Sequence, residues 1–265
     1  MNRRLVEMCV ATIACMAPGA LGAQERPLPA FDQSQAVRML RGGDPAAVFS
    51  VAHRSATDMT FGGPGASQEL RAALVNTLEQ AAVKEVERVR RGDFATEAEG
   101  EVRLALVEAV GRLGDPSTIP LLADVLADFS RDYLADFGEP ALDDVLRVVQ
   151  NPESPVGAIT EGLTALRFMV EDGSLGPASL DRVRIATRRH LERPSSFAVL
   201  GGAAQLGFVL GDPEFVALVK SFAEDPEALI VRGITSPKSI EFVQEHYAGA
   251  LLAGLPPKPL RKSRR

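Results

Sequence analysis

The chain has 265 residues, with 29 basic and 35 acidic side chains, two cysteines and no tryptophan. Tyr133 and Tyr247 are its only tyrosines, a composition that argues against a carbohydrate-binding platform or a base-stacking surface. Without its first 23 and last ten residues, the body carries 22 basic and 34 acidic side chains, a net charge of −12 that repels nucleic acid and excludes it as an expected partner.

Residues 1–23 have the pattern of a secretory signal peptide. Arg3 and Arg4 precede an apolar run at 5–17, and Ala20-Leu21-Gly22 forms a small-x-small cleavage site. The run is too short to span a bilayer, so no transmembrane span is expected after cleavage. The sequence therefore predicts a periplasmic or secreted protein.

Both cysteines lie inside this leader. Cys15 offers a lipoprotein alternative, but Thr12 is a poor match to the aliphatic residue usual in that motif. Loss of Cys9 and Cys15 with the leader would leave a chain without thiols. This excludes disulfides, thiolate metal sites and cysteine nucleophiles from the mature protein.

Behind the leader, residues 24–32 read as a proline-containing linker, and helical patterns begin at 33. We expect short helices at 33–41 and 45–55, a flexible Gly- and Pro-rich loop at 60–65, and a long helix from Ser67 to Gly92. Apolar residues at helical spacing predict one continuous buried face on the long helix: Leu70, Leu74, Leu78, Ala81 or Ala82, Val86 and Val89.

One turn motif recurs along the rest of the chain. Leu-Gly-Asp-Pro stands at 113–116 and again at 210–213, and Phe-Gly-Glu-Pro stands at 137–140. Gly114 suits the left-handed end of a helix, Asp115 can cap the next helix, and Pro116 suits its first turn. The expected helices lie at 97–113, 119–126, 142–149, 156–170, 177–193, 197–208, 215–222 and 238–252, and no segment alternates with the period of a strand.

A repeated helix–turn–helix unit cannot bury its apolar face alone, so each pair must pack on the next. Small residues such as Ala109, Gly162 and Gly207 lie where neighbouring helices would approach closely. The predicted fold class is all-α, a superhelix of antiparallel helix pairs over 33–252, followed by a disordered basic tail at 253–265.

The turn motifs, each followed by an amphipathic helix, resemble HEAT repeats, in particular the short bacterial type also found in bilin lyases. The clearest matches are 97–128, 131–171 and 195–225, and the arginine usual in the first helix is present as Arg103. The resemblance implies an α-solenoid that holds protein partners. It also leaves open a lyase-like enzyme.

No constellation of residues predicts catalysis, a cofactor or a metal. His53, His190 and His246 are far apart and belong to no ligand motif, so no metal site is expected. Ser195 and Ser196 lack a nucleophile elbow, and they read as a helix cap. The Gly-rich stretch 62–65 lacks the Gly-Lys-Ser/Thr that a phosphate loop needs.

Two basic features are candidate binding sites. The first is a positive strip on the helix 177–193, which could dock an acidic partner or else neutralise neighbouring acidic helices. It consists of Arg182, Arg184, Arg188, Arg189 and Arg193. The second is the tail, whose prolines keep it extended and whose cations attract anions. Its cations are Lys258, Arg261, Lys262, Arg264 and Arg265.

These observations favour an exported, non-enzymatic scaffold that binds a protein or peptide partner in the bacterial cell envelope. One alternative is a tether that binds anionic polymer or lipid through the tail, and the other is the lyase-like enzyme.

Overall fold

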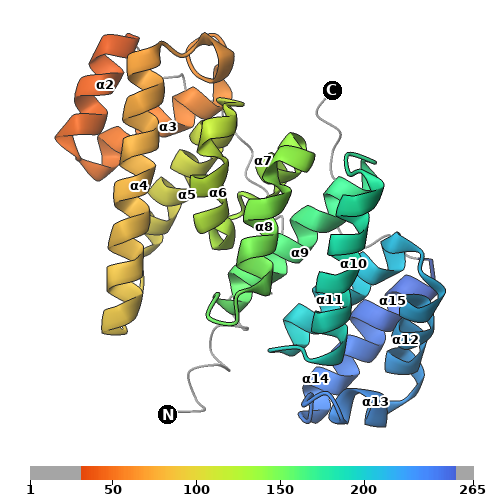
Figure 1. Ribbon diagram of the computed structural model, residues 1–265. Coiled ribbons are helices and arrows are strands. Elements are labelled where there is room, and N and C mark those ends of the chain that lie inside the picture. The colour runs from red at the N-terminus through yellow and green to blue at the C-terminus, as the bar shows by residue number, and fades with distance from the viewer. Residues whose placement is uncertain (1–30, 255–265) are drawn as a thin grey trace. The chain divides into compact units, whose positions relative to one another are not determined.

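The computed structural model describes residues 31–254, and Phe31 onward forms one compact unit. The leader at 1–23, the linker up to residue 30 and the cations of the tail lie outside the described residues. Within residues 31–254 every regular element is a helix and no strand occurs, which confirms the all-α, solenoid-like prediction (Figure 1). No helix in this range has both the length and the apolar character needed to cross a membrane.

The first four α-helices of the described range begin at side-chain caps. Asp32, Asp44, Ser67 and Thr96 each accept a hydrogen bond from a backbone N–H of the first turn, as polar residues do at helix starts. Gly43 (φ 70°) and Gly92 (φ 77°) end two of them in the left-handed conformation. The helices are α2 (Gln33–Gly42), α3 (Pro45–Thr57), α4 (Gln68–Arg91) and α5 (Glu97–Gly111).

The middle of the chain confirms the predicted helices but divides them with 3-10 turns at Pro116–Thr118, Leu126–Asp128 and Glu139–Ala141. The α-helices here are α6 (Ile119–Asp124), α7 (Arg131–Phe137), α8 (Leu142–Gln150) and α9 (Val156–Glu171).

The C-terminal part contains a π-helical segment that the sequence did not predict. The expected closing helix at 238–252 consists of α14 (Pro237–Phe242), a π-helix (Val243–Ala248) and α15 (Gly249–Leu252) in succession. Before it come α10 (Pro177–Glu192), α11 (Phe197–Leu210), α12 (Pro213–Glu224) and α13 (Pro226–Ile230).

The two Leu-Gly-Asp-Pro turns have the predicted chemistry. Gly114 (φ 62°) and Gly211 (φ 68°) adopt the left-handed conformation that favours glycine. Asp115 accepts a hydrogen bond from the Ser117 N–H at 2.9 Å, and Asp212 accepts one from the Glu214 N–H at 3.1 Å. Each turn therefore ends one helix and caps the next.

Glu139, in the third copy of the turn, acts differently. Its carboxylate accepts hydrogen bonds from the Ser179 hydroxyl and from the Gly176 N–H, the latter at 3.0 Å. These donors belong to the start of α10, and the hydrogen bonds from Ser179 and Gly176 lower the pKa of Glu139. The longer side chain thus caps a helix from a later pair instead of its own.

Successive helices pack as antiparallel pairs in two layers. The pairs in contact are α2 with α3, α4 with α5, α6 with α7, α8 with α9, and α10 with α11. Alternate helices also pack on each other, α2 on α4 in one layer and α3 on α5 and α9 on α11 in the other. The Leu-Gly-Asp-Pro turn at 113–116 joins two such pairs, so the range 97–128 combines the second helix of one pair, α5, with the first helix of the next, α6. The Gly43-Asp44-Pro45 turn instead lies within the pair α2–α3, and α11 and α12 contact each other across the turn at 210–213.

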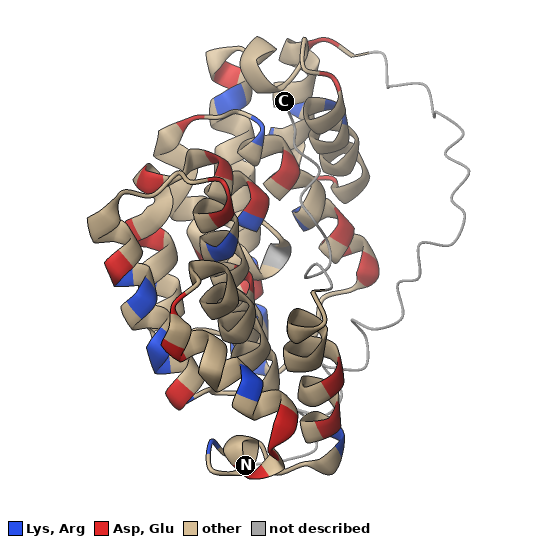
Figure 2. Cartoon of the chain, turned by 90° about the vertical axis from the view of Figure 1, so that its right-hand side faces the viewer, with Lys and Arg blue, Asp and Glu red and all other residues tan. Residues whose placement is uncertain are grey.

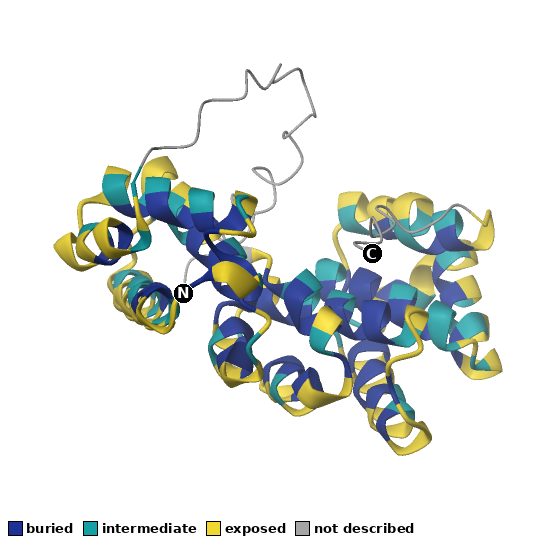
Figure 3. Cartoon of the chain, turned by 90° about the horizontal axis from the view of Figure 1, so that it is seen from above, coloured by how far each residue is buried: buried dark blue, intermediate teal, exposed yellow. Residues whose placement is uncertain are grey.

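Small residues let these helices approach closely, as predicted. A Cβ added at Gly162 in α9 would lie 2.5 Å from Cγ2 of Val149 in α8. A Cβ added at Gly111 would likewise clash with the ring of Tyr133, and one added at Gly201 would clash with the ring of Tyr247. Buried side chains run through the successive helices as one connected core (Figure 3).

The stretch 60–65 is folded more closely than the expected flexible loop. Gly63–Gly65 forms a turn of 3-10 helix, and a Cβ at Gly62 or Gly65 would meet the backbone of Ser55 or Thr60. These glycines allow two backbone segments to approach closely. Glycine is also frequent in flexible loops, so its presence in the sequence does not tell the two cases apart.

Candidate functional site

Three of the five arginines in the predicted positive strip on α10 pair with acidic residues. Arg182 pairs with Asp143 of α8 at 2.6 Å, Arg188 with Glu214 of α12 at 2.7 Å, and Arg184 with Asp181 of its own helix at 2.7 Å.

Arg189 donates to the Gln150 carbonyl oxygen at 2.9 Å, and Arg193 caps the C-terminus of the helix. Acidic and basic residues are interspersed over this part of the chain (Figure 2). The arginines therefore link α10 to α8 and α12, and their use as a binding site remains a prediction.

The three histidines lie in unrelated environments. His53 stacks on Phe49, and His246 packs on Phe242 beside Glu245. His190 is buried, with Nε2 2.9 Å from the Val149 carbonyl oxygen, and burial lowers its pKa. No group of three or more His, Cys, Asp or Glu side chains within residues 31–254 is arranged to hold a metal ion.

Ser196 caps α11 through its hydroxyl, which accepts from the Val199 N–H at 3.2 Å, as the sequence predicted for this serine pair. The cations of the tail lie outside the described residues.

The comparison of the chain with protein-family models, curated proteins and solved structures finds no match.

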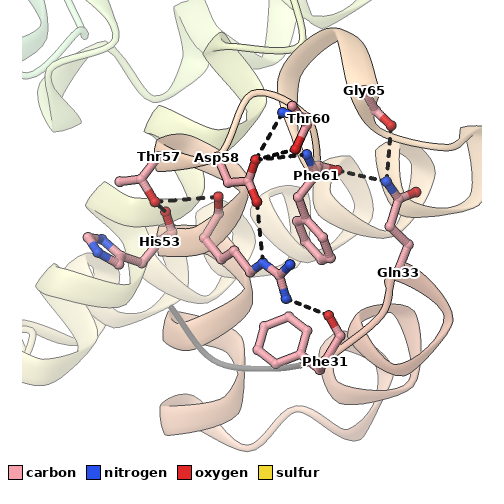
Figure 4. A network of polar contacts seen from close by, with 9 residues as sticks. Phe31, Gln33, His53, Thr57, Asp58, Thr60, Phe61 and Gly65 are labelled. Atoms are coloured by element: carbon pink, nitrogen blue, oxygen red, sulfur yellow. Dashed lines mark hydrogen bonds and ion pairs between the residues drawn. The ribbon is translucent and has the colours of Figure 1, made fainter. Parts of the chain in front are cut away.

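Arg54 holds the start of the described chain against the loop after α3. Its guanidinium lies 4.0 Å from the ring centroid of Phe61 and 5.1 Å from that of Phe31, and it also donates to the Phe31 carbonyl oxygen. Asp58 pairs with it at 3.7 Å and accepts hydrogen bonds from Thr60, which lower the pKa of Asp58 (Figure 4). This network ties Phe31 to the loop that follows α3.

Gln33 extends the same network to α4. Its amide donates to the carbonyl oxygens of Phe61 and Gly65 at 2.9 and 3.0 Å and accepts from the Ser67 N–H at 2.8 Å (Figure 4). Arg71 then donates to the Gly63 and Leu113 carbonyl oxygens at 2.8 and 3.3 Å. These bonds fix the beginning of α4 relative to α2.

An open groove of about 420 Å³ lies between α2 and α4. Its apolar floor includes Leu40 and Ala73, which are 4 % and 8 % exposed. Its polar lining comes from Arg41 at the end of α2 and from the following residues of α4: Gln68, Glu69, Asn76, Thr77 and Gln80.

The amide groups of this groove are free. Gln68, Asn76 and Gln80 are exposed, and no hydrogen bond to another part of residues 31–254 uses their side chains, whereas Gln33 uses both ends of its amide. Together with Ala72 they recur every four residues, which places them in one row along α4. Arg41 and Glu69 add one charge of each sign at the rim.

This groove was missed by the sequence analysis. Exposed Gln and Asn residues on a helix have no periodic apolar signal, and the groove exists only because α2 packs beside α4. The four-residue spacing of the amides was the one signal in the sequence.

Proposed function

We propose that the protein is an exported, non-enzymatic scaffold of HEAT-like helix pairs that binds an extended segment of a partner protein in the bacterial cell envelope. The groove between α2 and α4 is the proposed binding site. The row of free amides formed by Gln68, Asn76 and Gln80 carries the proposal.

The spacing of the amides suits an extended peptide. Residues four apart in a helix are separated by about 6 Å along its axis, at about 1.5 Å per residue. An extended peptide repeats every two residues, or about 6.6 Å. Asn76 and Gln80 can therefore form hydrogen bonds with backbone groups two residues apart on one edge of the bound peptide.

The chemistry of the groove supports the same ligand. An amide side chain offers both donors and an acceptor, the groups that an unpaired peptide N–H and C=O require. Leu40 and Ala73 give the floor an apolar surface for side chains of the peptide, while Arg41 and Glu69 can bind charged side chains at either end.

Export is supported by the leader-like pattern of residues 1–23, and the HEAT-like assignment by the repeated Gly-Asp-Pro turns. Tethering through the tail stays a prediction, since its cations lie outside the described residues. No arrangement of side chains in residues 31–254 favours the lyase-like alternative.

Selection from a random peptide library tests the groove. The full chain is used as bait, and the binding of selected peptides is measured by fluorescence anisotropy. We expect the double variant Asn76→Ala/Gln80→Ala to bind about 5- to 150-fold more weakly, because each of the two lost hydrogen bonds is worth about 0.5–1.5 kcal/mol. Alanine is a better helix former than either residue, so the change does not unfold α4.

The matched control is Lys84→Ala/Glu87→Ala. Both residues are exposed on the same helix and lie past the end of the groove. Peptides should bind this variant as they bind the wild type. Peptides that bind all three proteins equally, or a library that yields no binder, would contradict the proposed site.

A further inference from the structure

The C-terminal half of α4 exposes an apolar face that the sequence predicts to be buried. Leu70, Leu74 and Leu78 in the first half are 0 % exposed, whereas Val86 and Val89, on the continuation of the same helical line, are 50 % and 62 % exposed. The helical periodicity thus continues along α4 as predicted, but only half of the expected face is covered.

The difference in helix length explains this exposure. Gln33 at the start of α2 accepts a hydrogen bond from the Ser67 N–H at the start of α4, and Arg41 at the end of α2 lines the groove together with Gln80. α2 runs for ten residues, about 15 Å, while α4 runs for 24 residues, about 36 Å. The second half of α4 thus continues beyond the end of α2 (Figure 1).

The exposed face has a pattern that can pair with itself. Glu79, Val83, Val86 and Arg90 follow one another at spacings of four, three and four residues, which places them on one face of the helix. Val83 is 59 % exposed, and Glu79 and Arg90 are exposed with no ion pair to another described residue.

We propose that this face binds a second copy of the chain, with the two α4 helices antiparallel. With a twofold axis between positions 84 and 85, Val83 meets the second copy's Val86, and Glu79 meets the second copy's Arg90. One register therefore satisfies the apolar and the charged pairs together, as an isologous interface requires. Phe94, which is 72 % exposed, follows the helix by three residues and adds apolar surface at this end of α4.

The dimer is expected to be weak. A stable complex usually buries about 800 Å² on each partner, and four side chains and an adjoining phenylalanine supply only part of that area. The wild-type chain should therefore be monomeric at low concentration and become dimeric as its concentration rises. Glu79 and Val83 lie three residues after Asn76 and Gln80 and so adjoin the amide row, which means that the dimer would cover part of the groove. The inference rests on the exposed valines and charges of α4 and not on peptide binding.

Sedimentation velocity of the full chain over a wide range of concentration tests the proposal. The wild type should shift toward the mass of a dimer, and Val86→Lys should stay monomeric. Glu79→Arg and Arg90→Glu should each weaken the dimer, and Glu79→Arg/Arg90→Glu should restore it, because the reversed charges again pair across the twofold axis.

Ile185→Lys is the matched control, since Ile185 is an apolar residue of α10 that is 67 % exposed. It should dimerise like the wild type. A wild-type chain that stays monomeric throughout, or a Val86→Lys variant that dimerises normally, overturns the proposal. Peptide binding is also measured on Val86→Lys. A variant that binds peptide shows that the proposed groove functions whether or not the chain dimerises.

Discussion

Replacement of Gly162 by alanine tests the close packing between α9 and α8. The added Cβ would lie 2.5 Å from Cγ2 of Val149, although carbon atoms in contact prefer about 3.5–4.0 Å. Val149 is 1 % exposed and β-branched, so its side chain has little freedom to turn away. Such overpacking costs about 1–3 kcal/mol, and the better helix propensity of alanine offsets up to about 1 kcal/mol.

We therefore expect a net loss of about 1–2 kcal/mol in the free energy of unfolding. Urea unfolding followed by circular dichroism measures it. The control is Gly157→Ala in the same helix, where the new Cβ would meet only Ala127 at 3.9 Å, an ordinary contact. Gly157→Ala should not lower the stability. If Gly162→Ala is as stable as this control, the packing of α9 on α8 described above is incorrect.

Further substitutions at His190, Arg167 and Glu171 probe buried ionisable groups. Burial lowers the pKa of His190 below its ordinary 6.5, so the unfolded chain binds this proton more readily than the folded chain. The stability that the neutral, buried His190 contributes is therefore present above about pH 6.5 and is lost as the pH falls below it. The melting temperature of the wild type should drop more between pH 7.5 and 5.5 than that of His190→Gln. Equal drops for the two proteins would contradict this. The buried guanidinium of Arg167 lies 3.6 Å from the Glu171 carboxylate. Glu171→Gln should cost about 1–3 kcal/mol by leaving that cation without a counter-charge, whereas Arg167→Met/Glu171→Leu, which replaces both charges by apolar side chains, should be nearly neutral or stabilising. Urea midpoints in the opposite order would refute this.

The helices and their ends were accessible from the sequence because local chemistry determines them. Glycine after a helix, with aspartate and proline following, has the same effect at 114–116 and 211–213 in the structure. Glu139 shows the limit of such reasoning. Its extra methylene lets it reach α10, and nothing in the neighbouring sequence indicates a contact 37 residues away.

The arrangement of the helices was less accessible. The Gly-Asp-Pro turn marks where helices end, but it does not say which neighbours pack together. Val86 continues the periodicity of Leu78 but lies outside the core, because its exposure depends on how far α2 extends along α4 as well as on the sequence of α4. The arginines of α10 form a positive strip in the sequence, but their acidic partners on α8 and α12 appear only when the helices stack.

An engineered disulfide tests the stacking of alternate helices most directly. A Cβ at Gly202 in α11 would lie 3.5 Å from Cβ of Leu163 in α9, within the range of about 3.5–4.5 Å found across disulfides. In a Cys9→Ser/Cys15→Ser background, Leu163→Cys/Gly202→Cys should lose both thiols on mild oxidation of the folded chain. Leu163→Cys/Gly100→Cys should keep them, because a side chain at Gly100 has no neighbour within 4 Å. Two thiols that stay free at 163 and 202 would contradict the stacked arrangement of the helix pairs.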